Sequence, residues 1–239
     1  MDAIFDKFSL YDFFNVIFSG GIFLLGLHVI GIFPLSYIEK EIGLPSCDII
    51  MYAVIFFLCY IVGACLQFVG SWLTKNGDYF KFQSRMTNSI LNDKEIFDNN
   101  ECKLEVYKRL ADKIFEKKQI TVENGVYTEE QCGYFFSYCS YYIQVHGHSG
   151  KTEKMRALKG LDCLWMVCFA ILSIVAWVWC IYLLLCGLVD NITAVLVCAI
   201  IFPVLAIVSY HKMKTNVRYW IKMVLATYEA CSDENEDDE

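Results

Sequence analysis

Long apolar runs alternate with polar stretches along the chain. Residues 13–33, 49–73, 164–189 and 192–210 contain no Asp, Glu, Lys or Arg. Each run is long enough to cross a hydrocarbon core of about 30 Å as a helix that rises about 1.5 Å per residue. The pattern predicts an all-α, polytopic membrane protein with four transmembrane helices in two hairpins and a helical cytoplasmic module between the hairpins.

This alternation also predicts the domain organisation. The expected segments are a first transmembrane hairpin at 1–74, a cytoplasmic helical module at 75–160, a second transmembrane hairpin at 161–210, a cytoplasmic amphipathic helix at 211–231 and a disordered acidic tail at 232–239. The amphipathic helix either projects from the membrane or packs on the module. Pro203 is expected to kink the fourth span, because proline removes one helix hydrogen bond.

The module carries helical signals of its own. Apolar residues recur at helical spacing over residues 101–118, which predicts an amphipathic helix. Thr128 and Gln131 have the spacing of a capping box, which predicts that a second helix begins there and runs to about Val145. This helix is crowded with aromatic side chains, which either pack on the preceding helix or form a ligand pocket or protein interface. The residues expected at a partner contact are Tyr134, Phe135, Tyr138, Tyr141 and Tyr142.

Composition supports a membrane protein and says little about a partner. Hydrophobic residues make up 56% of the chain and charged residues 20%, a departure from soluble domains in both respects. The net charge of -7 is concentrated in residues 233–239, which are acidic except for Asn235. Basic and acidic residues nearly balance within 75–160, so direct nucleic-acid binding is not expected. The 12 cysteines are expected to be free thiols, since many of them lie in the apolar runs.

Lysine and arginine near the span ends predict the orientation. Lys40 alone lies on one side of the predicted spans. The basic residues on the other side are Lys7, Lys75, Lys81, Arg85, Lys151, Lys154, Arg156, Lys159, Lys212, Lys214 and Arg218. Both termini and the central segment are therefore expected to be cytoplasmic, in a bacterial inner membrane.

Several positions are candidates for lipid or helix contacts. Lys151, Lys154, Arg156 and Lys159 precede the third span, where they would anchor its topology or meet anionic lipid head groups. Gly63 and Gly70 are expected to form a helix-packing contact, either within one subunit or in a homo-oligomer.

His28 is the one ionisable side chain within a predicted span. Intramembrane ionisable residues are candidates for proton or ion handling, but a position near the end of the span also explains His28.

Motifs for chemistry are weak. The GKT sequence at 150–152 ends like a phosphate-binding loop, but the pattern requires a glycine where Val145 stands and a strand before it. Cys132, Cys139 and His146 share a helix face but are about 10 Å apart in successive steps, so one zinc ion cannot bind all three. A metal site here would need residues from elsewhere in the chain or from another subunit. No catalytic motif is present, and we expect neither an enzyme nor a bound cofactor.

Short motifs add a resemblance to a protein group. They are DFF at 12–14, GGIFL at 20–24, IVGACLQ at 61–67 and RALKGL at 156–161. With the layout of two spans on each side of a polar segment, the chain resembles uncharacterised bacterial four-span membrane proteins, some of which are membrane components of anti-phage defence systems. This resemblance implies a place in anti-phage defence and assigns no functional residue.

The leading hypothesis is a non-enzymatic, oligomeric inner-membrane protein that couples its spans to a cytoplasmic partner as a sensor or scaffold. That partner would be a protein encoded nearby. The alternative is a membrane-disrupting or pore-forming defence effector, and the third hypothesis is a small channel or transporter.

Overall fold

The computed structural model describes residues 10–33, 48–76, 81–122, 125–188 and 192–236. Within these ranges, four helices are long and apolar enough to cross a membrane. They are α2 (Leu10–Ile30), α4 (Asp48–Asn76), α8 (Gly150–Leu185) and α9 (Ile192–Glu236). The other helices are α5 (Phe82–Asn88), the 3-10 helix η2 (Lys94–Phe97), α6 (Glu101–Lys117) and α7 (Glu129–Val145). No strand occurs in these ranges, so the predicted all-α membrane class is confirmed. The pairing into two hairpins stays a prediction.

The chain divides into two compact units, and neither is a continuous stretch of sequence. Unit 1 comprises Met1–Thr74 and Ala157–Met213, and unit 2 comprises Lys75–Arg156 and Lys214–Glu239. Both α8 and α9 therefore begin in one unit and end in the other. The predicted loop 34–48, apart from Asp48, and the turn at Asp190 and Asn191 lie outside the described residues.

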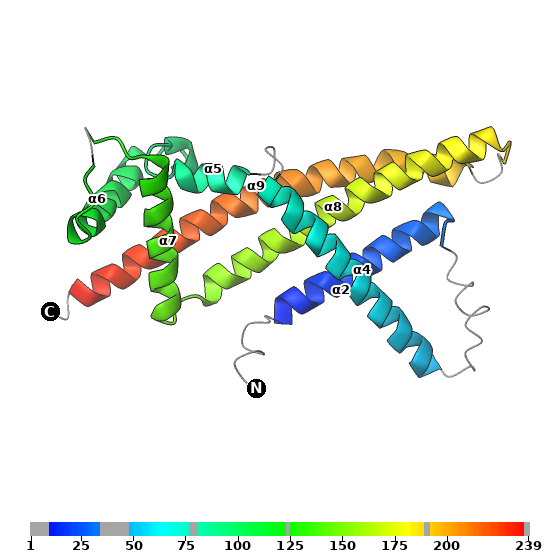
Figure 1. Ribbon diagram of the computed structural model, residues 1–239, viewed down its shortest axis with the longest axis horizontal. Helices are drawn as coiled ribbons and strands as arrows, with labels where there is room; N and C mark the ends of the chain where they lie inside the picture. Colours follow the sequence, from blue (N-terminus) through cyan, green and yellow to red (C-terminus); the bar gives the residue numbers. More distant parts are fainter. Residues whose placement is uncertain (1–9, 34–47, 77–80, 123–124, 189–191, 237–239) are drawn as a thin grey trace. The chain divides into compact units, whose positions relative to one another are not determined.

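In unit 1, α4 crosses α2 with the two backbones in close contact (Figure 1). A Cβ atom at Gly20 would lie 1.8 Å from the Cys59 carbonyl oxygen, and one at Gly63 would lie 1.9 Å from the Val16 carbonyl oxygen. Only glycine permits such an approach, because any side chain would overlap the facing peptide. The Phe13 ring lies 5.8 Å from the Tyr60 ring and extends the same contact.

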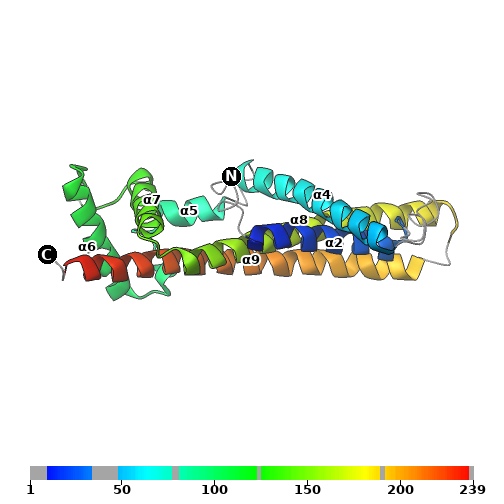
Figure 2. The same cartoon turned by 90° about the horizontal axis from the view of Figure 1, so that it is seen from below.

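Within unit 1, α8 and α9 run side by side in opposite directions (Figure 2). The rings of Phe169 and Phe202 stack with centroids 6.3 Å apart, and Asp162 faces Lys212 further along the pair. The core of this unit is apolar, with Cys168, Leu172 and Ala176 of α8 fully buried.

Many large apolar side chains on the outer faces of these helices are exposed. Phe18, Phe68, Ile174 and Leu185 are examples, and Leu185 is 82% exposed. So many exposed large apolar side chains are typical of helices that contact a membrane or a partner. Together with the length of the helices, it fits a protein embedded in a membrane.

Unit 2 is built on the predicted amphipathic helices. The Asn100 side chain accepts a hydrogen bond from the Lys103 amide and caps α6. Thr128 and Gln131 form the predicted capping box at the start of α7. α7 ends at Val145, and Gly147 follows with a φ of 77°, in the left-handed region that glycine favours. α8 then begins at Gly150 and continues without a break into its apolar part.

The C-terminal part of α9 packs inside unit 2, where α7 crosses it (Figure 1). Of the segment 211–231, which was expected either to project from the membrane or to pack on the module, the part from Lys214 onward belongs to unit 2. Its periodic apolar residues are all buried: Met213, Val217, Trp220, Ile221, Val224, Leu225 and Tyr228.

The tail differs from expectation. α9 continues to Glu236, whereas disorder is predicted from Ser232 onward, so that prediction is wrong for 232–236. The preceding turn is anchored by buried Tyr228 and Cys231, and the Ser232 hydroxyl donates to the Glu229 carbonyl within the helix. Residues 237–239 lie outside the described residues.

Candidate functional site

A buried carboxylate lies where α8 enters its apolar part. The Asp162 side chain is only 3% exposed, and the Lys212 ammonium of α9 lies 3.6 Å from its Oδ1. The Lys212 side chain itself is 60% exposed. Moving a charged carboxylate away from water is costly unless a cation and hydrogen bonds compensate. The pair therefore ties α8 to α9 at one specific position.

Trp165 extends this pair by one helical turn. The Lys212 ammonium lies 5.9 Å from the centroid of the Trp165 ring, within the range of a cation–π contact. In the described part of the chain, the Trp165 indole N–H and the Ser19 hydroxyl are buried without a hydrogen-bond partner. Unit 1 thus carries a polar cluster, defined here as Asp162, Trp165 and Lys212, inside otherwise apolar packing.

The cluster lies close to the unit boundary on both helices. Along α8, Asp162 follows the boundary at Ala157, and along α9, Lys212 directly precedes the boundary at Met213. The Asn15 amide of α2 donates to the Ala157 carbonyl at 3.2 Å, so a third helix holds the same stretch of α8. This arrangement positions the cluster to fix how the two shared helices leave unit 1.

Sequence reasoning missed the cluster. Asp162 is not singled out from the sequence, and Lys212 is named there only among the basic residues that predict the orientation. The signal that was present is a pair of opposite charges at the same-side ends of two consecutive spans. Charge position shows that such residues share a membrane side, but it does not show which helix faces meet.

The predicted helix-packing glycines both lie at contacts within the chain. Gly63 contacts α2 at Val16, and a Cβ atom at Gly70 would lie 3.3 Å from the Cys163 Sγ of α8. Both glycines are buried by neighbouring helices of unit 1.

The aromatic residues of α7 divide into a buried and an exposed set. Phe135 is fully buried, and Tyr138 and Tyr142 place their rings 6.2 and 5.2 Å from Tyr228 of α9. Tyr134 and Tyr141 are 40% and 68% exposed. Most of the ring packing thus uses the end of α9, although Tyr134 also contacts Phe115 of the preceding helix.

The charged candidates lie at the surface. Lys151, Lys154 and Arg156 are exposed in unit 2, and Lys159 is half-buried in unit 1. His28 is exposed near the end of α2, and its Nδ1 lies 3.2 Å from the Phe33 carbonyl oxygen.

The residues considered for metal or phosphate binding do not assemble. Cys132 and Cys139 are buried and His146 is exposed, with the His146 ring stacked on Tyr142 at 4.0 Å. Burial raises the pKa of both thiols, so neither is readily available as a thiolate ligand. No group of three potential metal ligands occurs in the described ranges. Thr152 is buried and donates its hydroxyl to the Ser149 carbonyl at 2.7 Å.

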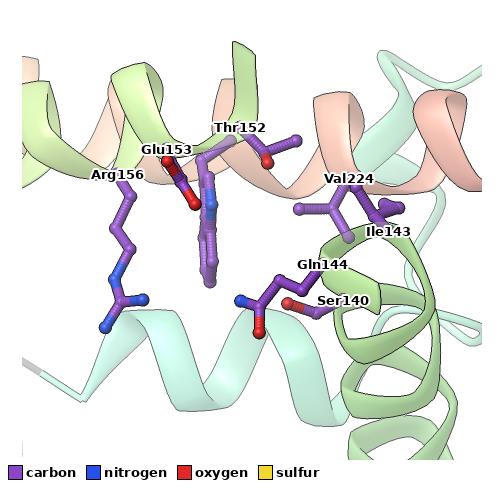
Figure 3. A pocket seen from close by; sticks show the side chains of 8 residues that line it. Ser140, Ile143, Gln144, Thr152, Glu153, Arg156 and Val224 are labelled. Carbon is purple, nitrogen blue, oxygen red and sulfur yellow. The ribbon is translucent and has the colours of Figure 1, made fainter. Parts of the chain in front are cut away.

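A small pocket lies within unit 2 among α7, α8 and α9 (Figure 3). Ser140 and Gln144 of α7 line it opposite Glu153 and Arg156 of α8, and Trp220 forms part of its wall. The volume of the pocket is about 30 Å³, which is room for water and not for an organic ligand. Its lining holds one acidic and one basic side chain, Glu153 and Arg156.

Comparisons with protein-family models, curated proteins and solved structures found no match for this chain. Fold and site define the protein as an all-helical chain with four helices capable of crossing a membrane and a polar cluster between two of them.

Proposed function

We propose that the protein is a non-enzymatic scaffold or sensor of a bacterial inner membrane that couples its membrane helices to a cytoplasmic protein partner. The observation that carries this proposal is the continuity of α8 and α9, each of which runs from one unit into the other. In unit 2, α8 buries Thr152, and α9 buries apolar residues such as Ile221 and Leu225. A helix shared by two cores is a rigid element through which a rearrangement in one core can bias packing in the other.

The orientation in this proposal rests on the distribution of lysine and arginine. Basic residues near the span ends gather on the side that holds unit 2, so unit 2 and both termini would face the cytoplasm. Lys151, Lys154 and Arg156 are exposed there, which suits contact with anionic lipid head groups.

The partner contact is narrower than the aromatic helix as a whole. Phe135, Tyr138 and Tyr142 are engaged inside unit 2, whereas Tyr134 and Tyr141 present exposed rings on α7. Exposed tyrosines are common anchors at protein interfaces. We therefore assign the contact to Tyr134 and Tyr141. The homo-oligomer and the role in anti-phage defence remain parts of the proposal that rest on the sequence.

Affinity capture of the full-length protein from membranes, expressed with its genomic neighbours, tests the proposal. We expect the wild-type chain to retain a neighbour-encoded protein and the Tyr134→Ala/Tyr141→Ala variant to lose it. Tyr219→Ala is the matched control, since Tyr219 is a 56% exposed tyrosine of unit 2 outside α7. The proposal fails if the wild-type chain retains no neighbour-encoded protein.

Membrane potential separates this function from the alternative effector. A scaffold should leave the potential unchanged when the chain is induced with its neighbours. Depolarisation under the same conditions would instead support a membrane-disrupting effector and overturn the scaffold.

A further inference from the structure

We infer that the cluster of Asp162, Trp165 and Lys212 is a register clasp, which sets the position of α9 along α8 where both helices leave unit 1. The inference rests on the proposed coupling function and names the device that carries it. Its basis is geometric: a carboxylate 3% exposed on one helix, its cation 3.6 Å away on the next, and an indole ring beneath that cation.

A charged contact inside apolar packing specifies position more strongly than apolar contacts do. Aliphatic and aromatic side chains find similar partners after a slip of one turn, about 5.4 Å along the axis. The short Asp162 side chain cannot follow such a slip, and a shift of α9 by one turn would carry the Lys212 ammonium away from the buried carboxylate that it pairs with. Buried polar pairs are best known for fixing register between helices in this way.

The surrounding contacts place this constraint between α8 and α9. α8 is held on other faces by α2, through Asn15 and the Ala157 carbonyl, and by α4, through Gly70 and Cys163. Towards α9, α8 is held by the ion pair with its indole and by the stacked rings of Phe169 and Phe202. Stacked rings tolerate sliding more than an ion pair between a short carboxylate and one lysine does, so the ion pair favours one register.

The register matters beyond unit 1 because both helices continue without a break. Arg156 and the residues before it on α8, and Lys214 and the residues after it on α9, belong to unit 2. A one-turn ratchet of one helix past another is a known form of switching transition. The clasp would hold one of two such arrangements until a signal in either unit releases it.

Thiol cross-linking of the full-length chain in membranes tests the register directly. The Phe169→Cys/Phe202→Cys variant places one thiol opposite another in the observed register, and native Cys198 lies one turn away from position 202 on α9. A short bifunctional thiol reagent, followed by fragmentation mass spectrometry, gives the ratio of 169–198 to 169–202 cross-links in a single sample.

Adding Lys212→Gln to the Phe169→Cys/Phe202→Cys variant should raise the ratio of 169–198 to 169–202 cross-links at least five-fold, because α9 would then be able to slip by one turn along α8. The matched control is Lys222→Gln, which removes a lysine from an ion pair with exposed Asp98 in unit 2, and it should leave the ratio unchanged. An unchanged ratio in Lys212→Gln overturns the clasp, and so does an equal rise in both variants, which would indicate general loosening.

A second variant covers the case in which Lys212→Gln fails to accumulate in the membrane. The Asp162→Asn/Lys212→Gln double variant removes the buried charge together with its partner. A rise of the cross-link ratio in this variant supports the clasp, and an unchanged ratio overturns it. The cross-link ratio requires no partner protein. Failure of the clasp is therefore distinguishable from failure of the proposed function, which is measured by partner capture.

Discussion

Gly63 of α4 lies so close to Val16 of α2 that an added Cβ atom would be 1.9 Å from the Val16 carbonyl oxygen. We predict that Gly63→Ala lowers the stability of the full-length protein in detergent by roughly 1–3 kcal/mol, because the two backbones must separate. Thermal unfolding followed by helical circular dichroism measures the loss.

Gly160→Ala is the matched control for this prediction. Gly160 lies within α8, and an added Cβ atom there meets no atom within 4 Å. Alanine is the better helix former, so the control should be neutral or stabilising by up to about 1 kcal/mol. Equal melting temperatures for Gly63→Ala and wild type would contradict the crossing.

The two faces of α7 should respond differently to truncation. Phe135→Ala removes a ring that is fully buried in unit 2, and a loss of about 3–5 kcal/mol is expected. Tyr141→Ala removes a ring that is 68% exposed, and stability should change by less than about 0.5 kcal/mol. Denaturant titration of the full-length protein compares the two variants, and a larger loss for Tyr141→Ala would place the wrong face of α7 in the core.

The ion pair between Lys222 and Asp98 predicts a pH dependence. Lys222 donates a hydrogen bond to Asp98 and, with its charge, lowers the pKa of that carboxyl below its ordinary value. Folding then favours the charged carboxylate, so this stabilisation is present above the ordinary carboxyl pKa and is lost as the pH falls through the lowered pKa. Lys222→Gln should raise the pKa of Asp98 towards its ordinary value.

Nuclear magnetic resonance titration of the labelled Asp98 carboxyl carbon checks this shift. Lys94→Gln serves as the control, because Lys94 forms a separate exposed ion pair with Glu101 and should leave the pKa of Asp98 unchanged. If Lys222→Gln and the wild type titrate at the same pH, Lys222 is not the cause of the lowered pKa.

Thiol reactivity should follow burial in unit 2. Cys102 is exposed, whereas Cys132 and Cys139 are fully buried, and burial raises the pKa of both buried thiols. The thiolate is the reactive form, so maleimide should modify Cys102 in the folded protein and reach Cys132 and Cys139 only after unfolding. Peptide mass spectrometry reads each site, and modification of Cys139 at the rate of Cys102 would show that the α7 core is open.

Local signals predicted the elements of this fold well. The uncharged runs located the four long helices, and the capping residues Thr128 and Gln131 located the start of α7. These features depend on neighbouring residues and on the spacing of apolar residues, both of which can be recognised in a short stretch of sequence. The full extent of α9 was underestimated because the acidic composition after Ser232 favours solvent, although it is compatible with a helix.

Contacts between distant segments were the part that sequence could not supply. The aromatic helix was expected either to pack on the preceding helix or to form a ligand pocket or protein interface. Tyr134 does contact Phe115 of the preceding helix, but Phe136, Tyr138 and Tyr142 meet Trp220 and Tyr228 at the far end of the chain. Periodicity shows which face of a helix is buried but not what covers it. The Asp162–Lys212 pair escaped for the same reason, since two charges at span ends look like ordinary membrane anchors until their facing positions are known.

The division of unit 2 between two distant segments has a consequence for biosynthesis. Residues 75–156 leave the ribosome well before Trp220, Val224 and Tyr228. The side chains of these three residues are buried in unit 2, to which residues 75–156 also belong. The early segment must therefore wait, with Phe136 and its neighbouring rings uncovered, until the fourth long apolar helix has been synthesised. Unit 2 can thus be completed only in chains whose last apolar helix has been synthesised. Chains truncated before α9 would expose the aromatic rings of α7, which cellular quality control could recognise.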